Sequence, residues 1–259
     1  MQVVLYTLIV FLATALGATT GAGGGAIIKP VFDLIGIDTA STIGVYSTIA
    51  VFAMCMSSIY KHAKNGVQFE CGILLSLSLG SVFGGIFGEL VFRQVTQIIP
   101  NSRVTLIQSI LLLFVILAVT IFTQFSDRIP SLGLRNTPLL FIFGCLVGAI
   151  SVFLGIGGGP LNIIVLVGLM GYTPKGSAAY SIAMIFFAQI PKIFNLVVNH
   201  TSYQFNTCLV PLIILAAIIG GNVGTLINHH FSERQVKAMY LIMMVFLLTT
   251  CATNIYRNW

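Results

Sequence analysis

Charged residues are scarce in this sequence. Asp, Glu, Lys and Arg together make up 7% of its 259 residues, whereas hydrophobic residues make up 57% and the mean hydropathy is +1.03. A soluble domain needs far more polar surface than this, so the composition excludes a soluble globular protein. It predicts a protein that passes through a membrane several times.

Other absences narrow the function. The five cysteines stand singly, without the spacing of a metal site, so we interpret them as small packing residues, and the histidines form no ligand pair. No metal or other cofactor is therefore expected. The sequence has no ATP-binding loop and no nucleophile–base group, which argues against an ATP-driven pump and against an enzyme. The net charge of +6 lies mostly between apolar runs, where membrane lipid, and not nucleic acid, is the expected partner.

Long apolar runs account for most of the chain. Several of them can cross the ~30 Å hydrocarbon core of a bilayer. They show no strand-like alternation, and a run in lipid must satisfy its own backbone, so they are predicted to be helices. The apolar N-terminus has no Lys or Arg before it, so we expect it to stay in the mature fold. The runs are 43–60, 72–92, 104–122, 177–198, 209–227 and 238–255.

Glycine, by contrast, is abundant and clustered. Two clusters, GAGGG at 21–25 and GIGGG at 155–159, interrupt apolar surroundings. Sliding the sequence over itself by 134 positions superimposes them, which predicts two homologous repeats. Without a gap, the same shift also places Tyr46-Ser47 on Tyr180-Ser181.

The basic residues favour an inverted arrangement of these repeats. If each cluster lies in one spanning helix, the loop Lys and Arg residues divide five against five between the two sides; if each breaks a re-entrant hairpin, they divide seven against three. The positive-inside rule favours the hairpins, and three spanning helices per half invert the second half. We therefore predict an all-α polytopic membrane protein of two inverted repeats, each with a glycine-broken re-entrant hairpin plus three spanning helices, and with both termini outside. The units are 1–125, the linker 126–137 and 138–259.

The glycine triplets suggest a binding role. Three consecutive glycines in a helix cost about 1 kcal/mol each relative to alanine, and irregular backbone at membrane depth must be covered by protein or face a polar cavity. A loop that leads into a half-helix offers free N–H groups and a positive dipole end to an anion. Close helix packing is the alternative, and we favour it for the glycines at 80–88 and 220–224. The candidates for anion binding are Gly23, Gly24, Gly25, Gly157, Gly158 and Gly159.

Two lysines stand inside apolar segments, where a charge is costly and indicates function. Lys29 follows the first glycine cluster, and it could instead snorkel to the surface or pair with Asp33 at i+4. Lys192 follows the helix-kinking Pro191 and could also snorkel. We predict that one or both lysines hold the anion, with Lys192 as the first choice.

Uncharged polar side chains gather after the glycine clusters as further donors. Glu89 lies well inside an apolar run, and we interpret it as a structural partner of Arg93 at i+4, with proton carriage as the alternative. The polar candidates are Tyr46, Ser47, Asn162, Tyr180, Ser181, Gln189 and Asn195.

These motifs resemble a known family. GAGGGAIIKP at 21–30, GIGGGPLN at 155–162 and PKGSAAYSIAMIFFAQIPK at 174–192 are similar to the TauE/SafE family of sulfite exporters, also called toluene-sulfonate uptake permeases. The resemblance implies transport of small sulfur-containing anions, such as sulfite, sulfonates or thiosulfate, across a prokaryotic inner membrane. Typical members carry apolar residues where this chain has Lys29 and Asn162.

The resulting prediction is a secondary transporter, a permease for a small sulfur-containing or organic anion that works by alternating access. A coupling proton or sodium ion is a candidate partner. A passive anion channel is the alternative, and an enzyme is not expected. These residues are compatible with several small anions and with either import or export.

Overall fold

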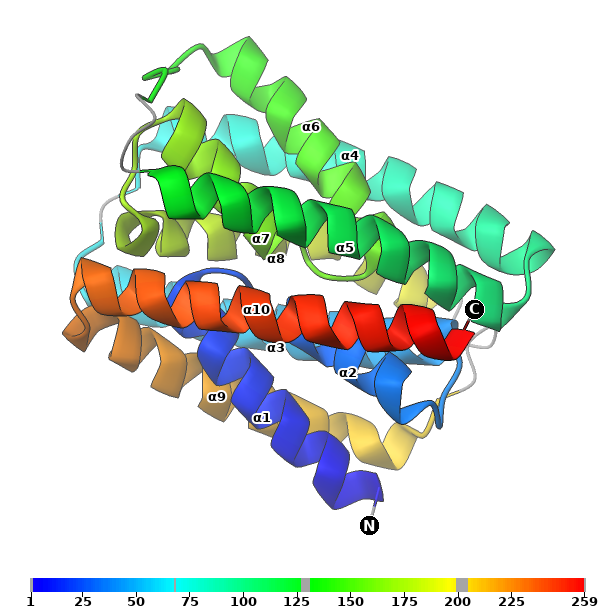
Figure 1. Cartoon of the computed structure of the whole chain (residues 1–259). Coiled ribbons are helices and arrows are strands. Elements are labelled where there is room, and N and C mark those ends of the chain that lie inside the picture. The colour runs from blue at the N-terminus through cyan, green and yellow to red at the C-terminus, as the bar shows by residue number, and fades with distance from the viewer. Residues whose placement is uncertain (1, 68, 127–130, 199–204, 259) are drawn as a thin grey trace.

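The computed structural model describes residues 2–67, 69–126, 131–198 and 205–258, and all regular elements in these ranges are helical (Figure 1). Among the described residues, eight helical segments are long and apolar enough to cross a membrane. They are Gln2–Thr20, Ala40–Lys64, Cys71–Ile98, Asn101–Phe125, Thr137–Leu154, Pro174–Val198, Thr207–His230 and Glu233–Arg257. The elements are α1 (Gln2–Thr20), α2 (Gly25–Ile35), α3 (Ala40–Lys64), α4 (Cys71–Ile98), α5 (Asn101–Phe125), α6 (Thr137–Leu154), α7 (Gly159–Ile164), the π-helical turn η2 (Val165–Leu169), α8 (Pro174–Val198), the 3-10 turn η4 (Thr207–Leu209), α9 (Val210–His230) and α10 (Glu233–Asn258).

Local sequence explains where several helices begin and end. The side chain of Thr39 accepts a hydrogen bond from the N–H of Thr42 at the start of α3, and Asn136 does the same for Leu139 at the start of α6. Glycines in the left-handed region end α2 and α6, with φ of 70° at Gly36 and 71° at Gly155. The first residue of the second glycine cluster, Gly155, therefore ends α6.

The first glycine cluster turns the chain back on itself. The Tyr6 hydroxyl, near the start of α1, donates to Asp38 Oδ2 over 2.7 Å, and Asp38 lies just beyond the end of α2. The arms α1 and α2 thus begin and end at the same end of the helix bundle. Both chain termini lie at this end (Figure 1), where the Asn254 amide of α10 donates to Pro30 O over 2.9 Å. We call it the terminus end.

The second hairpin enters from the other end. The N–H groups of Leu132 and Leu134, which precede α6, donate to Gly168 O and Leu169 O at the end of η2, over 3.3 and 2.8 Å. The arms α6 and α7–η2 therefore start and finish at the end opposite the termini, which we call the basic end. The remaining long helices run between the two ends, so the arms α1 and α6 turn back although each is long enough to cross.

Contacts between the halves come in reciprocal pairs. The Ser47 hydroxyl of the first half donates to Gly155 O of the second over 3.3 Å, and the Ser181 hydroxyl of the second donates to Gly21 O of the first over 2.6 Å. In both pairs the serine and its glycine shift by the 134 positions of the sequence register. This is the pattern expected of a two-fold relation, and superposition of the halves about an axis in the membrane plane stays a prediction.

The two tyrosines that precede these serines repeat the pattern. The Tyr46 hydroxyl accepts a hydrogen bond from Asn206 N over 2.8 Å, and the Tyr180 hydroxyl accepts one from Glu70 N over 2.7 Å. Each tyrosine thus holds the backbone that starts a helix of the other half. Tyr46 lies toward the terminus end and Tyr180 toward the basic end, so the two are not parts of one pocket.

The glycines at 80–88 and 220–224 permit close helix packing, as the sequence predicts. A Cβ added to Gly84 on α4 would overlap the carbonyl of Cys145 on α6, and one on Gly220 of α9 would come within 2.6 Å of Phe11 O on α1. Each hairpin's long arm is therefore pressed against a spanning helix of the other half, backbone to backbone.

Basic residues lie mainly at the basic end. The positive-inside rule therefore predicts that this end faces the cytoplasm and that the termini lie outside. Among the described residues, Lys61, Lys64, Arg135, Lys175, Arg234 and Lys237 lie at the basic end, against Arg93, Arg103 and Arg257 at the terminus end; Arg128 lies outside the described residues.

Two native cysteines report this orientation. Cys55 and Cys251 are buried packing residues, as expected, but Cys71 and Cys208 are exposed, because they stand at helix starts outside the packed interior. In single-cysteine variants on intact cells, an impermeant maleimide should label Cys208, at the terminus end, and should label Cys71 only after the membrane is permeabilised. The reverse labelling would invert the assigned orientation.

Candidate anion-binding site

The glycine-rich turns of the two hairpins pack against each other. A Cβ added to Gly159, the first residue of α7, would overlap the carbonyl of Ala22, and one added to Gly25, the first residue of α2, would lie 3.0 Å from Ile156 O. These contacts are again reciprocal between the halves. Glycine is required here because backbone meets backbone.

The triplets interrupt hairpins and do not lie within continuous helices, as predicted. Gly23 and Gly157 have φ of 73° and 74°, and Gly158, before α7, has φ of 83°. Gly24, before α2, is right-handed at −63°, so the two turns are similar but not identical. Carbonyl oxygens of the opposite turn lie against both half-helix starts, so these starts face backbone in this conformation. Their role as an anion cradle stays a prediction.

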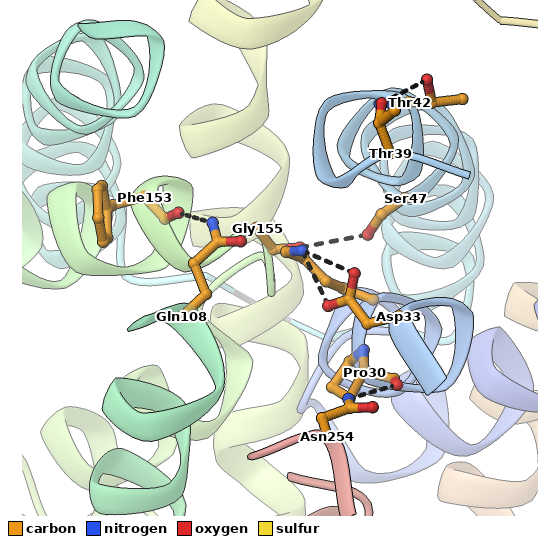
Figure 2. A network of polar contacts seen from close by, with 10 residues as sticks. Pro30, Asp33, Thr39, Thr42, Ser47, Gln108, Phe153, Gly155 and Asn254 are labelled. Atoms are coloured by element: carbon orange, nitrogen blue, oxygen red, sulfur yellow. Dashed lines mark hydrogen bonds and ion pairs between the residues drawn. The ribbon is translucent and has the colours of Figure 1, made fainter. Parts of the chain in front are cut away.

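Lys29 is buried and paired. It is 2% exposed, and its Nζ lies 3.0 and 3.3 Å from the two carboxylate oxygens of Asp33. Its alkyl chain lies against Gly155, where an added Cβ would be 2.6 Å from Cδ. Figure 2 shows Asp33 and Ser47 on the same side of Gly155. Of the alternatives weighed for Lys29, the pair with Asp33 is the one found, and the lysine does not reach the surface.

Lys192 is held more loosely. It is 8% exposed, so it does not snorkel, and its Nζ lies 4.0 Å from Glu89 Oε2 and 5.2 Å from the centre of the Phe92 ring. The ammonium group thus has a carboxylate at the outer limit of an ion pair and an aromatic face beside it. A cavity of about 10 Å³, room for about one water, adjoins it and is lined by Ser41, Val45, Thr48, Glu89, Phe92, Lys192 and Leu196.

Asn195 links Glu89 to Arg93. Its amide Nδ2 donates to Glu89 Oε1 over 2.9 Å, and its Oδ1 accepts from Arg93 over 3.1 Å. The interpretation of Glu89 and Arg93 as a simple i+4 pair therefore needs correction, because α8 places Asn195 and Lys192 against the carboxylate. Asn195 organises this network instead of lining an open pocket.

Two buried glutamines border the second glycine turn. Gln189 is 3% exposed, its Oε1 has no hydrogen-bond partner among the described residues, and its Nε2 lies 3.4 Å from where a Cβ of Gly157 would be. Gln108 of α5, not singled out in the sequence, donates to Phe153 O over 2.7 Å, and its Oε1 also lacks a described partner (Figure 2). A glutamine within the first turns of the apolar run at 104–122 was the signal for it.

The other polar candidates hold the hairpins together. Asn162 donates to Ser181 O over 3.2 Å, while Ser47 and Ser181 bond to glycine carbonyls of the opposite turn. These side chains have backbone partners in this conformation. They position the crossing of the hairpins, next to the lysines.

The charged side chains here leave a positive surplus. Counted in their ionised forms, Lys29, Lys192 and Arg93 carry three positive charges against two on Asp33 and Glu89. Buried charges in a membrane are retained where they serve a substrate or ion path. A surplus of one positive charge, beside the crossing of two broken helices, suits an anion.

The architecture is that of a membrane transporter: many apolar helices, two opposed hairpins, and charged groups where the hairpins cross. Residues 6–250 match the family described as sulfite exporter TauE/SafE, and the chain belongs to this family. A probable membrane transporter protein of Methanocaldococcus jannaschii is 25% identical over 249 residues, which cover 91% of this chain and 90% of that protein. The probable membrane transporter protein YunE of Bacillus subtilis is 21% identical over 285 positions, covering 100% of this chain and 99% of that protein. No solved structure matches the chain at a significant level.

Proposed function

We propose that this membrane transporter is a secondary carrier for a small sulfur-containing or organic anion, such as sulfite, a sulfonate or thiosulfate, in a prokaryotic inner membrane. The observation that carries the proposal is the surplus of positive charge around Lys192. A fixed anion in an apolar interior needs a counter-charge to offset its lost hydration. Lys29 is the less available lysine because both of its partner's oxygens are bound to it.

A polar cavity gives a route to this lysine. It has a volume of about 580 Å³, opens at the terminus end and includes Ser41, Thr42 and Tyr46 in its wall. Ser41 also lines the small cavity at Lys192, so both spaces border the same residue of α3. An anion entering from the terminus end would reach Lys192 after a small movement of α3 or α8.

Contacts at the basic end close the opposite route. The Glu70 carboxylate accepts a hydrogen bond from Tyr172 over 2.8 Å and pairs with Arg135. Alternating access would break these contacts and close the terminus end as one half rocks against the other. The two halves could rotate about the reciprocal contacts between the hairpin turns, which would then act as the pivot of this movement.

Ligand screening tests the substrate class. We expect one of sulfite, thiosulfate, sulfoacetate, taurine or a simple carboxylate to stabilise the purified protein by about 2.7 kcal/mol at 100 times its Kd. For a chain of this size, that raises the melting temperature by about 5–10 °C. Chloride at equal ionic strength is the control, and an equal rise with chloride would argue against a specific site.

Transport by the same anion separates the two candidate mechanisms. In proteoliposomes we expect saturable counterflow, in which unlabelled anion inside drives uptake of labelled anion from outside. Large unitary currents without counterflow would instead establish a passive anion channel.

A further inference from the structure

Glu89 has no place in a simple anion site. It is 5% exposed on α4, 4.0 Å from the lysine proposed to hold the substrate. An ionised carboxylate beside an anion repels it, and its burial is costly in a membrane. Its position needs a role beyond binding the substrate.

Among the residues that the structure describes, groups from α3, α4 and α8 lie against Glu89. From α8, Lys192 lies at ion-pair distance and Asn195 donates a hydrogen bond; on α4 itself, Arg93 acts through Asn195. From α3, the wall of the shared cavity presents Ser41, Val45 and Thr48, none of which carries a charge. The Lys29–Asp33 pair of α2 is internally neutral.

Charge balance links Glu89 to the substrate. With Glu89 ionised, the five charged groups of the site carry a surplus of one positive charge. With Glu89 protonated, the surplus is two, which is what a dianion requires. A dianion that binds Lys192 competes with Glu89 for the ammonium group, and a buried carboxylate that loses an opposite charge favours its protonated form.

We propose that Glu89 is the binding site of a coupling proton, an inference that rests on the proposed anion transport. Without substrate, the ionised carboxylate sits beside Lys192. When a dianion occupies the ammonium group, Glu89 takes up one proton from the water on the same side of the membrane. Both leave on the opposite side, where the carboxylate returns to Lys192. No other bond forms or breaks, and each dianion is moved with one proton.

Thiosulfate is a suitable probe because both of its acid groups are strong, so it stays a dianion in mildly acidic and neutral solution. In proteoliposomes with the potential clamped by potassium and valinomycin, an inward thiosulfate gradient should acidify the interior. The apparent affinity for thiosulfate should rise about tenfold for each unit by which pH falls while Glu89 is ionised in the empty carrier, since one proton binds with the anion.

Glu89→Gln separates coupling from binding. The variant keeps Lys192, so thiosulfate exchange should persist, but its affinity should become independent of pH and a thiosulfate gradient should move no protons. Glu233→Gln, the same replacement at the basic end, should retain both the proton flux and the pH dependence.

The possible outcomes distinguish the coupling role of Glu89 from the proposed anion transport. Proton flux in Glu89→Gln, or its loss in Glu233→Gln, would overturn the coupling role of Glu89. A folded Glu89→Gln variant without exchange would also overturn it, because Glu89 would then act in binding itself. A wild-type affinity that does not change with pH would overturn it without any variant. Absence of thiosulfate exchange in the wild type would instead overturn the proposed function for this anion class.

Discussion

Lys192→Ala should lower anion transport by at least about 100-fold and remove anion-dependent stabilisation. Removing one partner from a buried ion pair costs about 3–5 kcal/mol, and a similar loss of counter-charge for the substrate corresponds to a factor of at least about 100 in affinity. Counterflow in proteoliposomes and the anion-induced rise in melting temperature measure the two effects. Lys192→Gln should retain weak binding, because an amide can still donate a hydrogen bond.

The alanine variant alone is ambiguous, because it leaves Glu89 buried without Lys192. The structure supplies two matched double variants that remove a lysine together with its carboxylate. Lys192→Met with Glu89→Gln should fold and bind no anion, whereas Lys29→Met with Asp33→Asn should fold and keep measurable exchange. The opposite result would move the anion site to Lys29, next to Gly155.

Features that depend on local chemistry could be predicted from the sequence. Glycine triplets break helices, so the turns at 21–25 and 155–159 followed from composition, and the distribution of Lys and Arg then indicated that the arms turn back. The Lys29–Asp33 pair could also be foreseen, because residues four apart on a helix face each other.

Contacts between distant segments could not be predicted in the same way. Arg93 was assigned to Glu89 because both lie on one helix, but Lys192 and Asn195 reach the same carboxylate from more than a hundred positions away. Helical periodicity predicts which residues share a face of one helix. It does not predict which face of another helix packs against them. Gln108 was missed for the same reason.

The shift of 134 positions that aligns the two halves also indicates which contacts between them are equivalent. Residues aligned by the register, such as Ser47 and Ser181, make equivalent contacts across the two halves. Their hydroxyls were interpreted as donors to a substrate, yet both are bonded to backbone carbonyls. A polar side chain at membrane depth must satisfy any irregular backbone nearby before it can serve a ligand.

The crossing of the hairpins should be the least tolerant part of the fold, and Gly159→Ala should reveal it. Gly159 lies in a right-handed helical turn, so alanine meets no strain in φ; the added Cβ instead overlaps the carbonyl of Ala22. Overpacking of this kind costs about 3 kcal/mol, or about 6–12 °C in melting temperature for a chain of this size. Transport should fall as well, because the two half-helices would be pushed apart at the proposed pivot.

Two further glycines serve as controls. Gly25→Ala, the equivalent change in the first hairpin, meets Val51 Cγ2 at 2.9 Å and Ile156 O at 3.0 Å, so its effect should be smaller than that of Gly159→Ala. Gly72→Ala, at the start of α4, has no neighbour within 4 Å and should stabilise the helix by up to about 1 kcal/mol. A melting temperature of Gly159→Ala equal to that of Gly72→Ala would contradict the close crossing. In that case the glycines would be free to serve the ligand, and the half-helix starts, not Lys192, would be the first place to look for the anion.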